Sequence, residues 1–289
     1  HIQNPLSEDQ THLRVSLVPN MLKTVAKNLS EHDELKLYEI GRSYQKRAGD
    51  YFPLEEKIIC GAVVVREQAA REKSASSAAF RHHSLPFFHA KGALESFFEK
   101  FSAGRVWFEE SSAVPSHANA APPYSNAAPM YANAARCADI FVETTSERAH
   151  VGRVFELHPT VAKNFGIEKD VALFEINFSV LAHVQLPEPA YAPIPKFPGV
   201  SIDISVDCEK KTRSYDVERV IRKAGAPLLQ NAELIGIFEG ASLGENIKAL
   251  TYRLLLQTPD KTLTDEEMGT QRTKILEALK RAGHSIRGA

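Results

Sequence analysis

The sequence predicts an α+β protein of two domains joined by a proline-rich linker. In residues 199–289, strand-like and helix-like segments follow one another in the order β-α-β-β-α-β. In residues 1–186, strand-like segments outnumber helix-like ones, which favours an antiparallel sheet with helices packed on one face. Residues 187–198 hold five prolines in twelve positions, a composition typical of an extended, semi-rigid linker.

The N-terminal domain is expected to begin with a helix. Pro19 suits a first helical position, and Leu22, Val25 and Leu29 recur at helical spacing. His158 precedes Pro159 and is expected to cap a second short helix, with a catalytic role as the alternative. The remaining elements expected in this domain are strands at 35–40, 57–65, 138–142, 151–155 and 172–178 and helices at 90–101 and 159–164.

Two stretches of this domain are expected to be loops. Residues 66–84 are charged and then rich in Ser and Ala. Residues 111–135 hold nine alanines interrupted by four prolines. Alanine favours helix, but the prolines prevent a long one, so this stretch is interpreted as a low-complexity excursion.

The C-terminal domain shows clearer signals. Residues 200–206 alternate apolar and polar side chains, as a half-buried strand does. A helix follows, expected to be capped by Ser214, and then strands at 234–238 and 249–257. Thr264 and Glu267 have the spacing of a capping box, and the helix that they begin is expected to stop at Gly283 before a short strand at 284–287. This order is the ferredoxin-like plan, which by itself carries no function.

Composition places few limits on function. The chain of 289 residues is 43% hydrophobic and 25% charged, which is ordinary for a soluble globular protein. Residues 1–189 hold 20 Lys and Arg against 23 Asp and Glu, whereas residues 190–289 hold 15 against 13. The basic excess of the C-terminal part is small, so any RNA contact must be local. Three scattered cysteines without a C-x-x-C pair predict reduced thiols in a cytoplasm.

Several motifs in a fixed order carry a family resemblance. In the C-terminal domain these are Lys196-Phe-Pro-Gly-Val200, Asp203, Gly236-Ile-Phe-Glu-Gly240, Lys248-Ala-Leu-Thr-Tyr-Arg253 and Thr262-Leu-Thr-Asp-Glu-Glu267. They resemble the ferredoxin-fold anticodon-binding domain at the end of the bacterial phenylalanyl-tRNA synthetase β subunit. Earlier motifs, in residues 4–10, 14–19, 37–42, 87–92 and 152–159, are similar to the catalytic-like module of that subunit. The implied fold is a class II synthetase-like core followed by the ferredoxin-like domain.

The core is expected to be catalytically inactive. Active class II synthetases hold ATP with an arginine in a glycine-rich segment, because guanidinium groups bind phosphate oxygens in pairs. The comparable segment, Val171 to Leu181, has neither glycine nor arginine and is interpreted as a core strand. The cluster of His82, His83 and His89 lacks the spacing of a metal site, so a polar loop is expected and no metal.

Two other places depart from the family pattern. Ser201 and Ile202 stand where the family usually has basic residues, and residues 131–138 replace a His-Pro-Gly-Arg motif. The chain opens at His1 without Met and without the tRNA-body and editing modules of the family, so a piece of a longer subunit is expected.

The resemblance implies a structural and tRNA-anticodon-binding role in the charging of tRNA(Phe). The chemistry, with Mg-ATP, would lie on a partner α subunit in a cytoplasmic (αβ)2 complex, and this chain would bind no cofactor. One alternative is a stand-alone RNA- or protein-binding module derived from a synthetase. Another is a small enzyme with a site in the N-terminal sheet.

Two sets of site residues follow from the resemblance and the strand pattern. Tyr252 and Arg253 alternate on one strand, and the apolar pattern around Tyr252 favours Arg253 as the exposed contact. The expected RNA-binding residues are Asp203, Lys248, Tyr252, Arg253 and Arg287. The expected α-subunit interface includes Arg14, Leu17, Leu22, Val25 and Leu29, with the apolar members divided between the core and the partner.

Overall fold

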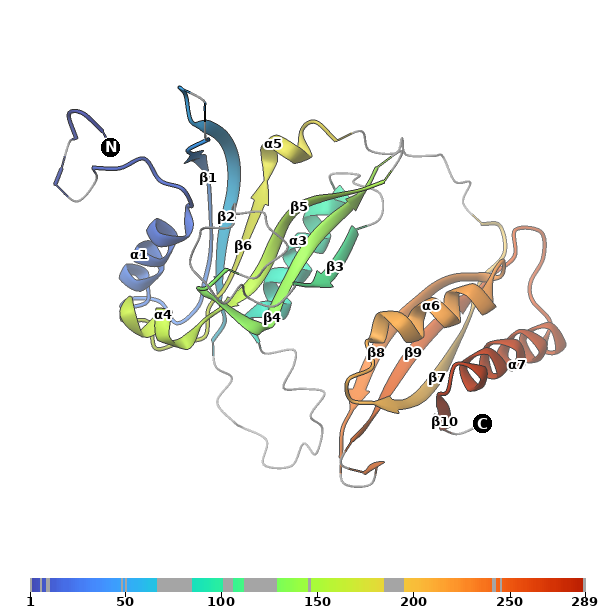
Figure 1. The fold of residues 1–289 in the computed structure, drawn as a ribbon. Helices are drawn as coiled ribbons and strands as arrows, with labels where there is room; N and C mark the ends of the chain where they lie inside the picture. Colours follow the sequence, from blue (N-terminus) through green and yellow to red (C-terminus); the bar gives the residue numbers. More distant parts are fainter. Residues whose placement is uncertain are drawn as a thin grey trace. The chain divides into compact units, whose positions relative to one another are not determined.

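The structure, a computed structural model, describes residues 2–66, 85–100, 106–111, 129–184 and 195–287, without positions 6, 9, 10, 48, 50, 145, 146, 241, 242 and 245. The described residues form two compact units, one within residues 2–184 and one within 195–287 (Figure 1). Most of the predicted proline-rich linker, the two stretches predicted as loops except for residues 66, 111 and 129–135, and His82 and His83 lie outside the described residues.

The first unit is built on a six-stranded sheet in the order β1-β2-β6-β5-β4-β3. Every neighbouring pair is antiparallel, which confirms the predicted sheet type. The strands are β1 (Leu35–Gln45), β2 (Leu54–Val64), β3 (Val106–Glu110), β4 (Ala132–Glu143), β5 (Arg148–Leu157) and β6 (Ala172–Asn177). The sequence did not predict β3, and most of the other strands extend beyond their predicted ends.

Helices cover both faces of this sheet, and the expectation of helices on one face was wrong. Alternate residues of β2, including Cys60 and Ala62, face a core shared with α1 (Val18–Asn28) and α4 (Pro159–Asn164). Val63, the residue after Ala62, points to the opposite face and joins a second core shared with α3 (Pro86–Lys100). A strand buried on both faces is apolar at consecutive positions, which explains the uninterrupted run without charged residues from Ile58 to Val64 in β2.

Two helix starts in this unit are set by side-chain caps. The His158 ring nitrogen accepts a hydrogen bond from the Thr160 N–H at 3.2 Å, so the predicted cap of α4 is confirmed. Asn177 likewise accepts from the Val180 N–H at 3.0 Å and begins α5 (Phe178–Leu181). The segment predicted as one strand to residue 178 is therefore a strand that ends at Asn177, where the cap turns the chain into a helix.

The second unit has the predicted ferredoxin-like fold. Its sheet has the order β10-β7-β9-β8, with antiparallel neighbours throughout. Both helices share a single core with one face of this sheet. The elements are β7 (Val200–Glu209), α6 (Ser214–Gly225), β8 (Leu229–Phe238), β9 (Ile247–Leu256), α7 (Asp265–Arg281) and β10 (Ser285–Arg287).

The predicted helix ends of this unit were right for α7 and wrong for α6. The Thr264 hydroxyl accepts from the Glu267 N–H at 3.3 Å, and the Glu267 carboxylate accepts from the Thr264 N–H at 3.0 Å, which completes the capping box. Gly283 follows α7 with φ of +87°, a conformation that glycine adopts readily. Ser214 is the first residue of α6 rather than its cap, and its carbonyl accepts a hydrogen bond from a core side chain instead.

In the part of the chain that the structure describes, no helix is long and apolar enough to cross a bilayer. Within the same residues, no group of three His, Cys, Asp or Glu side chains is placed to hold a metal ion. Cys60, Cys137 and Cys208 are buried free thiols, and burial raises the pKa of each.

Candidate nucleic-acid interface

The sheet of the second unit has one face that its helices leave uncovered. Successive side chains of a strand point to opposite faces. Along β7 and β9, every second residue, counted from Asp203 and Arg253, points away from the helices. The residues between them, such as Ile204 and Leu254, are buried and face the helices. The uncovered face, named here the open face, is therefore carried by the odd-numbered residues of these two strands.

An ion pair with two parallel hydrogen bonds dominates the open face. Arg253 donates from Nε to Asp203 Oδ1 at 3.0 Å and from Nη2 to Oδ2 at 2.9 Å. The two residues are direct cross-strand partners, and their side chains are about half exposed, 52% and 46%. The hydrogen bonds from Arg253 lower the pKa of the Asp203 carboxyl. The pair is thus formed in water and is available to a ligand on this face.

A second carboxylate lies on the other side of Arg253. Glu233, an exposed residue on β8, is the cross-strand partner of Arg253 on that side. The row across the sheet is therefore Asp203, Arg253 and Glu233, with one positive and two negative groups. Carboxylates accept hydrogen bonds from base amino groups, and guanidinium donates to base or phosphate oxygens. This row can read polar base edges and has little net attraction for phosphate.

The next row of the open face is small and polar. Gly236, Thr251 and Ser205 are in register across β8, β9 and β7. The Ser205 and Thr251 hydroxyls are hydrogen-bonded at 2.9 Å. Arg287 on β10 is the partner of Ser205 at the edge, and its Nε lies 3.6 Å from Asp207 Oδ2. Small side chains leave room for a flat ring to lie against the sheet, with Arg287 beside it.

The structure separates the five residues predicted to bind RNA. Asp203, Arg253 and Arg287 lie on the open face. Tyr252 faces the helices, is fully buried and donates from its hydroxyl to the Ser214 carbonyl at 2.7 Å. The prediction for Tyr252 is corrected, because a side chain under two helices cannot contact a base. Lys248 has the parity of Tyr252 and stands beside Cys208, so it lies away from Arg253 at the end of the covered face.

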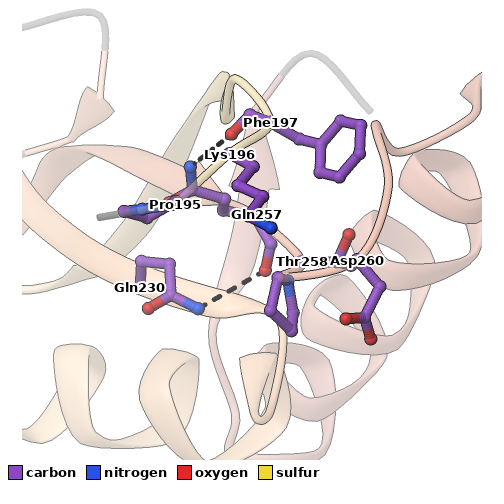
Figure 2. A pocket seen from close by; sticks show the side chains of 8 residues that line it. Pro195, Lys196, Phe197, Gln230, Gln257, Thr258 and Asp260 are labelled. Atoms are coloured by element: carbon purple, nitrogen blue, oxygen red, sulfur yellow. Dashed lines mark hydrogen bonds between the residues drawn. The ribbon is translucent and has the colours of Figure 1, made fainter. Parts of the chain in front are cut away.

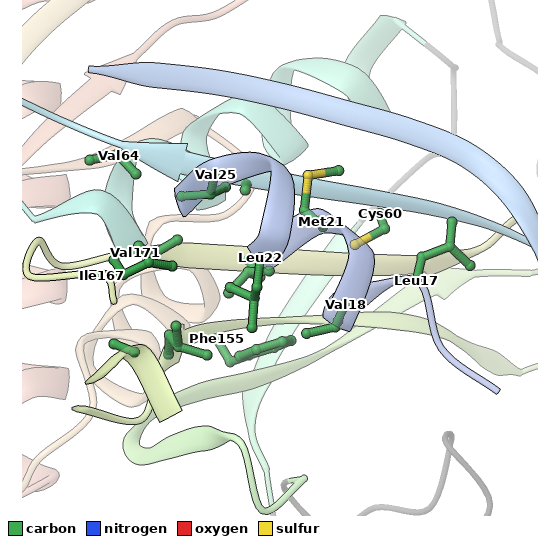
Figure 3. Packing of buried hydrophobic residues seen from close by; sticks show 14 of the residues in the cluster. Leu17, Val18, Met21, Leu22, Val25, Cys60, Val64, Phe155, Ile167 and Val171 are labelled. Atoms are coloured by element: carbon green, nitrogen blue, oxygen red, sulfur yellow. The ribbon is translucent and has the colours of Figure 1, made fainter. Parts of the chain in front are cut away.

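The apolar stripe of α1 belongs to the core of the first unit. Leu17, Leu22 and Val25 are buried among β-sheet side chains, and Leu29 is partly buried against the same cluster (Figure 3). The prediction of a partner contact is corrected for the three buried residues, because the chain's own sheet covers them, and for Leu29 it stays a prediction. Helical spacing alone does not distinguish an intramolecular from an intermolecular apolar stripe.

Arg14 is held against the edge strand β1. Its Nη1 lies 2.6 Å from Glu39 Oε1, and its Nε donates to the Arg42 carbonyl at 2.9 Å. The Arg14 carbonyl also accepts from the Tyr44 N–H at 2.9 Å. A side chain at Gly41 would meet Arg14, since an ideal Cβ there lies 2.1 Å from Nη2. The segment before α1 is therefore fixed along the sheet edge.

This edge exposes apolar side chains that the sequence did not single out. Leu13 and Val15 flank Arg14, and Tyr38 and Ile40 are on β1 itself. All four are exposed, with Tyr38 at 73%. An edge strand with exposed apolar side chains is a ready surface for another chain. In the sequence, the only hint of this surface was that apolar Tyr38 and Ile40 fall at the alternate positions of β1 that face away from the core. Such alternation is also found in any strand with one face in water, so it did not indicate a partner.

A buried polar row in the first unit was also missed. Asp139, Arg153 and Glu175 are in register on β4, β5 and β6. Arg153 Nη2 lies 2.9 Å from Asp139 Oδ1, and both side chains are at most 5% exposed. Glu175 accepts hydrogen bonds from Ser16 at 2.9 Å and Tyr131 at 3.1 Å. The signal was present as one charged residue within each of the otherwise uncharged stretches 137–142, 151–155 and 172–177.

Electrostatics distinguish the two carboxylates of this row. Burial raises the pKa of Glu175, and the hydrogen bonds from Ser16 and Tyr131 offset this only in part. Burial acts in the same direction on Asp139, but bonding to His150 and the charge of Arg153 outweigh it, and the pKa is lowered. The Ser16 bond joins the segment before α1 to the sheet centre, so the row positions the N-terminal segment.

Comparison with known proteins gives the family of this architecture. Residues 1–178 match the family model described as the phenylalanyl tRNA synthetase beta chain CLM domain. Residues 195–287 match the ferredoxin-fold anticodon binding domain. The first match spans more than half of the chain. The chain belongs to the phenylalanyl-tRNA synthetase β-chain family.

Individual relatives agree with this membership. The phenylalanine–tRNA ligase β subunit of Moorella thermoacetica is 32% identical over 288 residues, which are 99% of this chain and 32% of the relative. The corresponding subunit of Bacillus licheniformis is 30% identical, over 96% of this chain and 31% of the relative. That of Listeria monocytogenes is 27% identical, over 98% and 32%. The chain thus spans about a third of the length of these relatives.

Proposed function

We propose that this chain is the anticodon-binding and subunit-pairing portion of a cytoplasmic phenylalanine–tRNA ligase. The observation that carries the proposal is the open face, with the Arg253–Asp203 pair at its centre, on a domain of the anticodon-binding family. Ferredoxin-like RNA-binding proteins use such a face, because unpaired bases can lie flat on a sheet while polar side chains read their edges. An anticodon loop presents unpaired bases of this kind.

The polar rows assign roles to the open face. Asp203 and Glu233 accept hydrogen bonds from base amino groups, and Arg253 donates once a base separates it from one carboxylate. A base lies flat against the small side chains of the next row, which are Gly236, Thr251 and Ser205. Arg287 on the open face and Lys248 at the end of the covered face supply phosphate contacts at the rim of the unit, which weaken as salt rises.

The test of this proposal is a titration of an anticodon stem-loop RNA against the full chain. Tight binding that discriminates the phenylalanine anticodon from others is expected. Asp203→Ala should weaken binding about tenfold, because one hydrogen bond to a charged group is lost. Asp216→Ala, which removes an exposed carboxylate at the start of α6, is the matched control. Binding with no anticodon preference, or equal effects of both variants, would contradict the assignment.

The partner in the proposal is the α subunit, in an (αβ)2 complex. The pairing surface is the edge formed by β1 and the segment before α1, where Leu13, Val15, Tyr38 and Ile40 are exposed. Long exposed edge strands pair readily with other chains, and apolar side chains beside them supply the buried area. In this proposal the β1 edge contacts the α subunit, in place of the α1 residues that were expected to do so and are buried in the core.

Amino-acid activation belongs to the partner in this proposal, together with Mg-ATP. The segment that would hold ATP in an active core is β6 and its end, which here has the bulky Phe174 over Gly61, where an ideal Cβ would lie 2.2 Å from the ring. Leu173 and Ile176 are buried in the two cores on either side. Phenylalanine-dependent pyrophosphate exchange by the chain alone is expected to be at background. Exchange that persists in preparations free of α subunit would contradict this expectation.

A further inference from the structure

A cavity of about 620 Å³ opens at one end of the sheet in the second unit (Figure 2). Three segments line it: Pro195 to Phe197 at the entry to β7, Gln230 near the start of β8, and Gln257 to Asp260 after β9. Its volume lies within the range of about 300–1,000 Å³ that is typical of small-ligand sites. Neither set of predicted site residues includes any of these side chains.

Gln257 organises the cavity. Its backbone N–H donates to the Leu228 carbonyl at 2.9 Å, and its side-chain Nε2 donates to the Phe197 carbonyl at 2.7 Å. Gln230 Nε2 lies 3.4 Å from the Gln257 carbonyl. These bonds tie the three lining segments together. The Oε1 atoms of Gln230 and Gln257 accept no hydrogen bond from any residue that the structure describes, so they are available to a ligand.

The cavity continues the open face. Arg253, Leu255 and Gln257 alternate along β9 and its end, so all three have the parity of the open face. Gln257 lies four positions after Arg253, which corresponds to about 13 Å along an extended strand. A few nucleotides of unpaired RNA span such a distance. A strand of RNA that contacts Arg253 and runs along β9 therefore arrives at the cavity.

The lining chemistry fits a nucleobase. Amide groups both donate and accept hydrogen bonds, as base edges do. Pro195 and Pro259 supply apolar walls, and Lys196 is an exposed cation at the rim. We infer that this cavity binds the base of one unpaired nucleotide next to the stretch that lies on the open face. The inference rests on the proposed function, since it places a further nucleotide of the same RNA loop.

The inference is tested with the full chain and a series of anticodon stem-loops, each with one abasic nucleotide in the loop. Gln230→Ala should weaken binding of the intact loop about fivefold, the effect of one net hydrogen bond. With the loop that lacks the base held in the cavity, Gln230→Ala should have no further effect. Asn246→Ala, which removes an exposed amide at the opposite end of β9, is the control and should bind every loop as wild type does.

Three other results of these titrations would overturn the cavity inference. If Gln230→Ala binds the intact loop as wild type does while Asp203→Ala is weakened, the cavity inference is overturned and the proposed function stands. If Gln230→Ala weakens all abasic loops by the same factor, no single base occupies the cavity and the inference is again overturned. If the wild-type chain binds no loop, the proposed function fails and the cavity inference fails with it. Circular dichroism melting curves establish that both variants remain folded.

Discussion

The two sheets of this protein carry the same ion pair in opposite settings. In the first unit Asp139 and Arg153 are cross-strand partners 2.9 Å apart, with side chains 5% and 4% exposed. In the second unit Asp203 and Arg253 are cross-strand partners 2.9 Å apart, with side chains 46% and 52% exposed. Strand pairing brings both pairs into contact as direct cross-strand neighbours. Whether a pair holds the fold together or meets a ligand depends on what covers that face of the sheet.

The two sheets differ in how many of their faces are covered by helices. In the first unit α1 and α4 pack on one face of the sheet and α3 on the other, so polar side chains in the central strands are buried. In the second unit α6 and α7 both pack on one face, and the opposite one stays in water. A buried charge requires a partner, whereas an exposed one can exchange its partner for a ligand.

Removal of the buried guanidinium should have the largest effect. Arg153→Met is expected to destabilise the first unit by about 3–5 kcal/mol, because Asp139 would keep its charge in the core with only His150 and Ser111 as described polar neighbours. Trp107, the single tryptophan of the chain, lies on β3 of this unit and reports its unfolding in guanidinium. A loss below about 1 kcal/mol, the value typical of exposed pairs, would contradict the contrast between the two sheets.

The α1 stripe and the β1 edge give the next contrast. Leu22→Ala should cost the first unit about 2–5 kcal/mol through the cavity that it leaves, while the folded variant still co-purifies with the α subunit. Tyr38→Ser, at an exposed position, should leave the Trp107 unfolding curve nearly unchanged and weaken co-purification. The reverse result, with Tyr38→Ser fully assembled, would remove β1 from the proposed interface.

The exposed pair should matter for binding more than for stability. Arg253→Met is expected to change the stability of the second unit by less than about 1 kcal/mol, because water solvates the remaining Asp203. Its affinity for the anticodon stem-loop should fall about tenfold. Thermal unfolding followed by circular dichroism and the RNA titration measure the two quantities. A large loss of stability with unchanged affinity would invert the roles assigned to the two sheets.

The smallest expected effect is a change in pH dependence. The pKa of Glu175 is raised by burial, so its contribution to stability is present when the carboxyl is protonated and is lost as the pH rises through the folded-state value. Glu175→Gln is neutral throughout. As the pH rises above the ordinary Glu pKa of about 4.3, wild type should lose stability relative to Glu175→Gln. Unfolding curves from Trp107 at several pH values measure the difference, and a constant difference would contradict the raised pKa.

Much of the second unit could be predicted from the sequence because its signals are local. The alternation in residues 200–206 and the Thr264–Glu267 capping box depend on neighbours within a few positions. The parity of Tyr252 and Arg253 likewise indicated which of the two would be exposed. The role first given to Tyr252 was wrong because its hydroxyl bonds to Ser214, a residue far away in the chain.

The sequence by itself determined the family, the element order of the second unit, the caps of α4 and α7 and the parity of Tyr252 and Arg253, since ordered motifs carry the first and neighbouring residues carry the others. Only the tertiary structure decided which face of each sheet the helices cover, and therefore which polar or apolar side chains are buried and which are exposed. Leu22 and Val25 form an apolar stripe that could pack in a core or against a partner, and in the structure it packs against the sheet of the first unit. Gln230 and Gln257 meet in one cavity because separate strands end together, which is a long-range consequence of register.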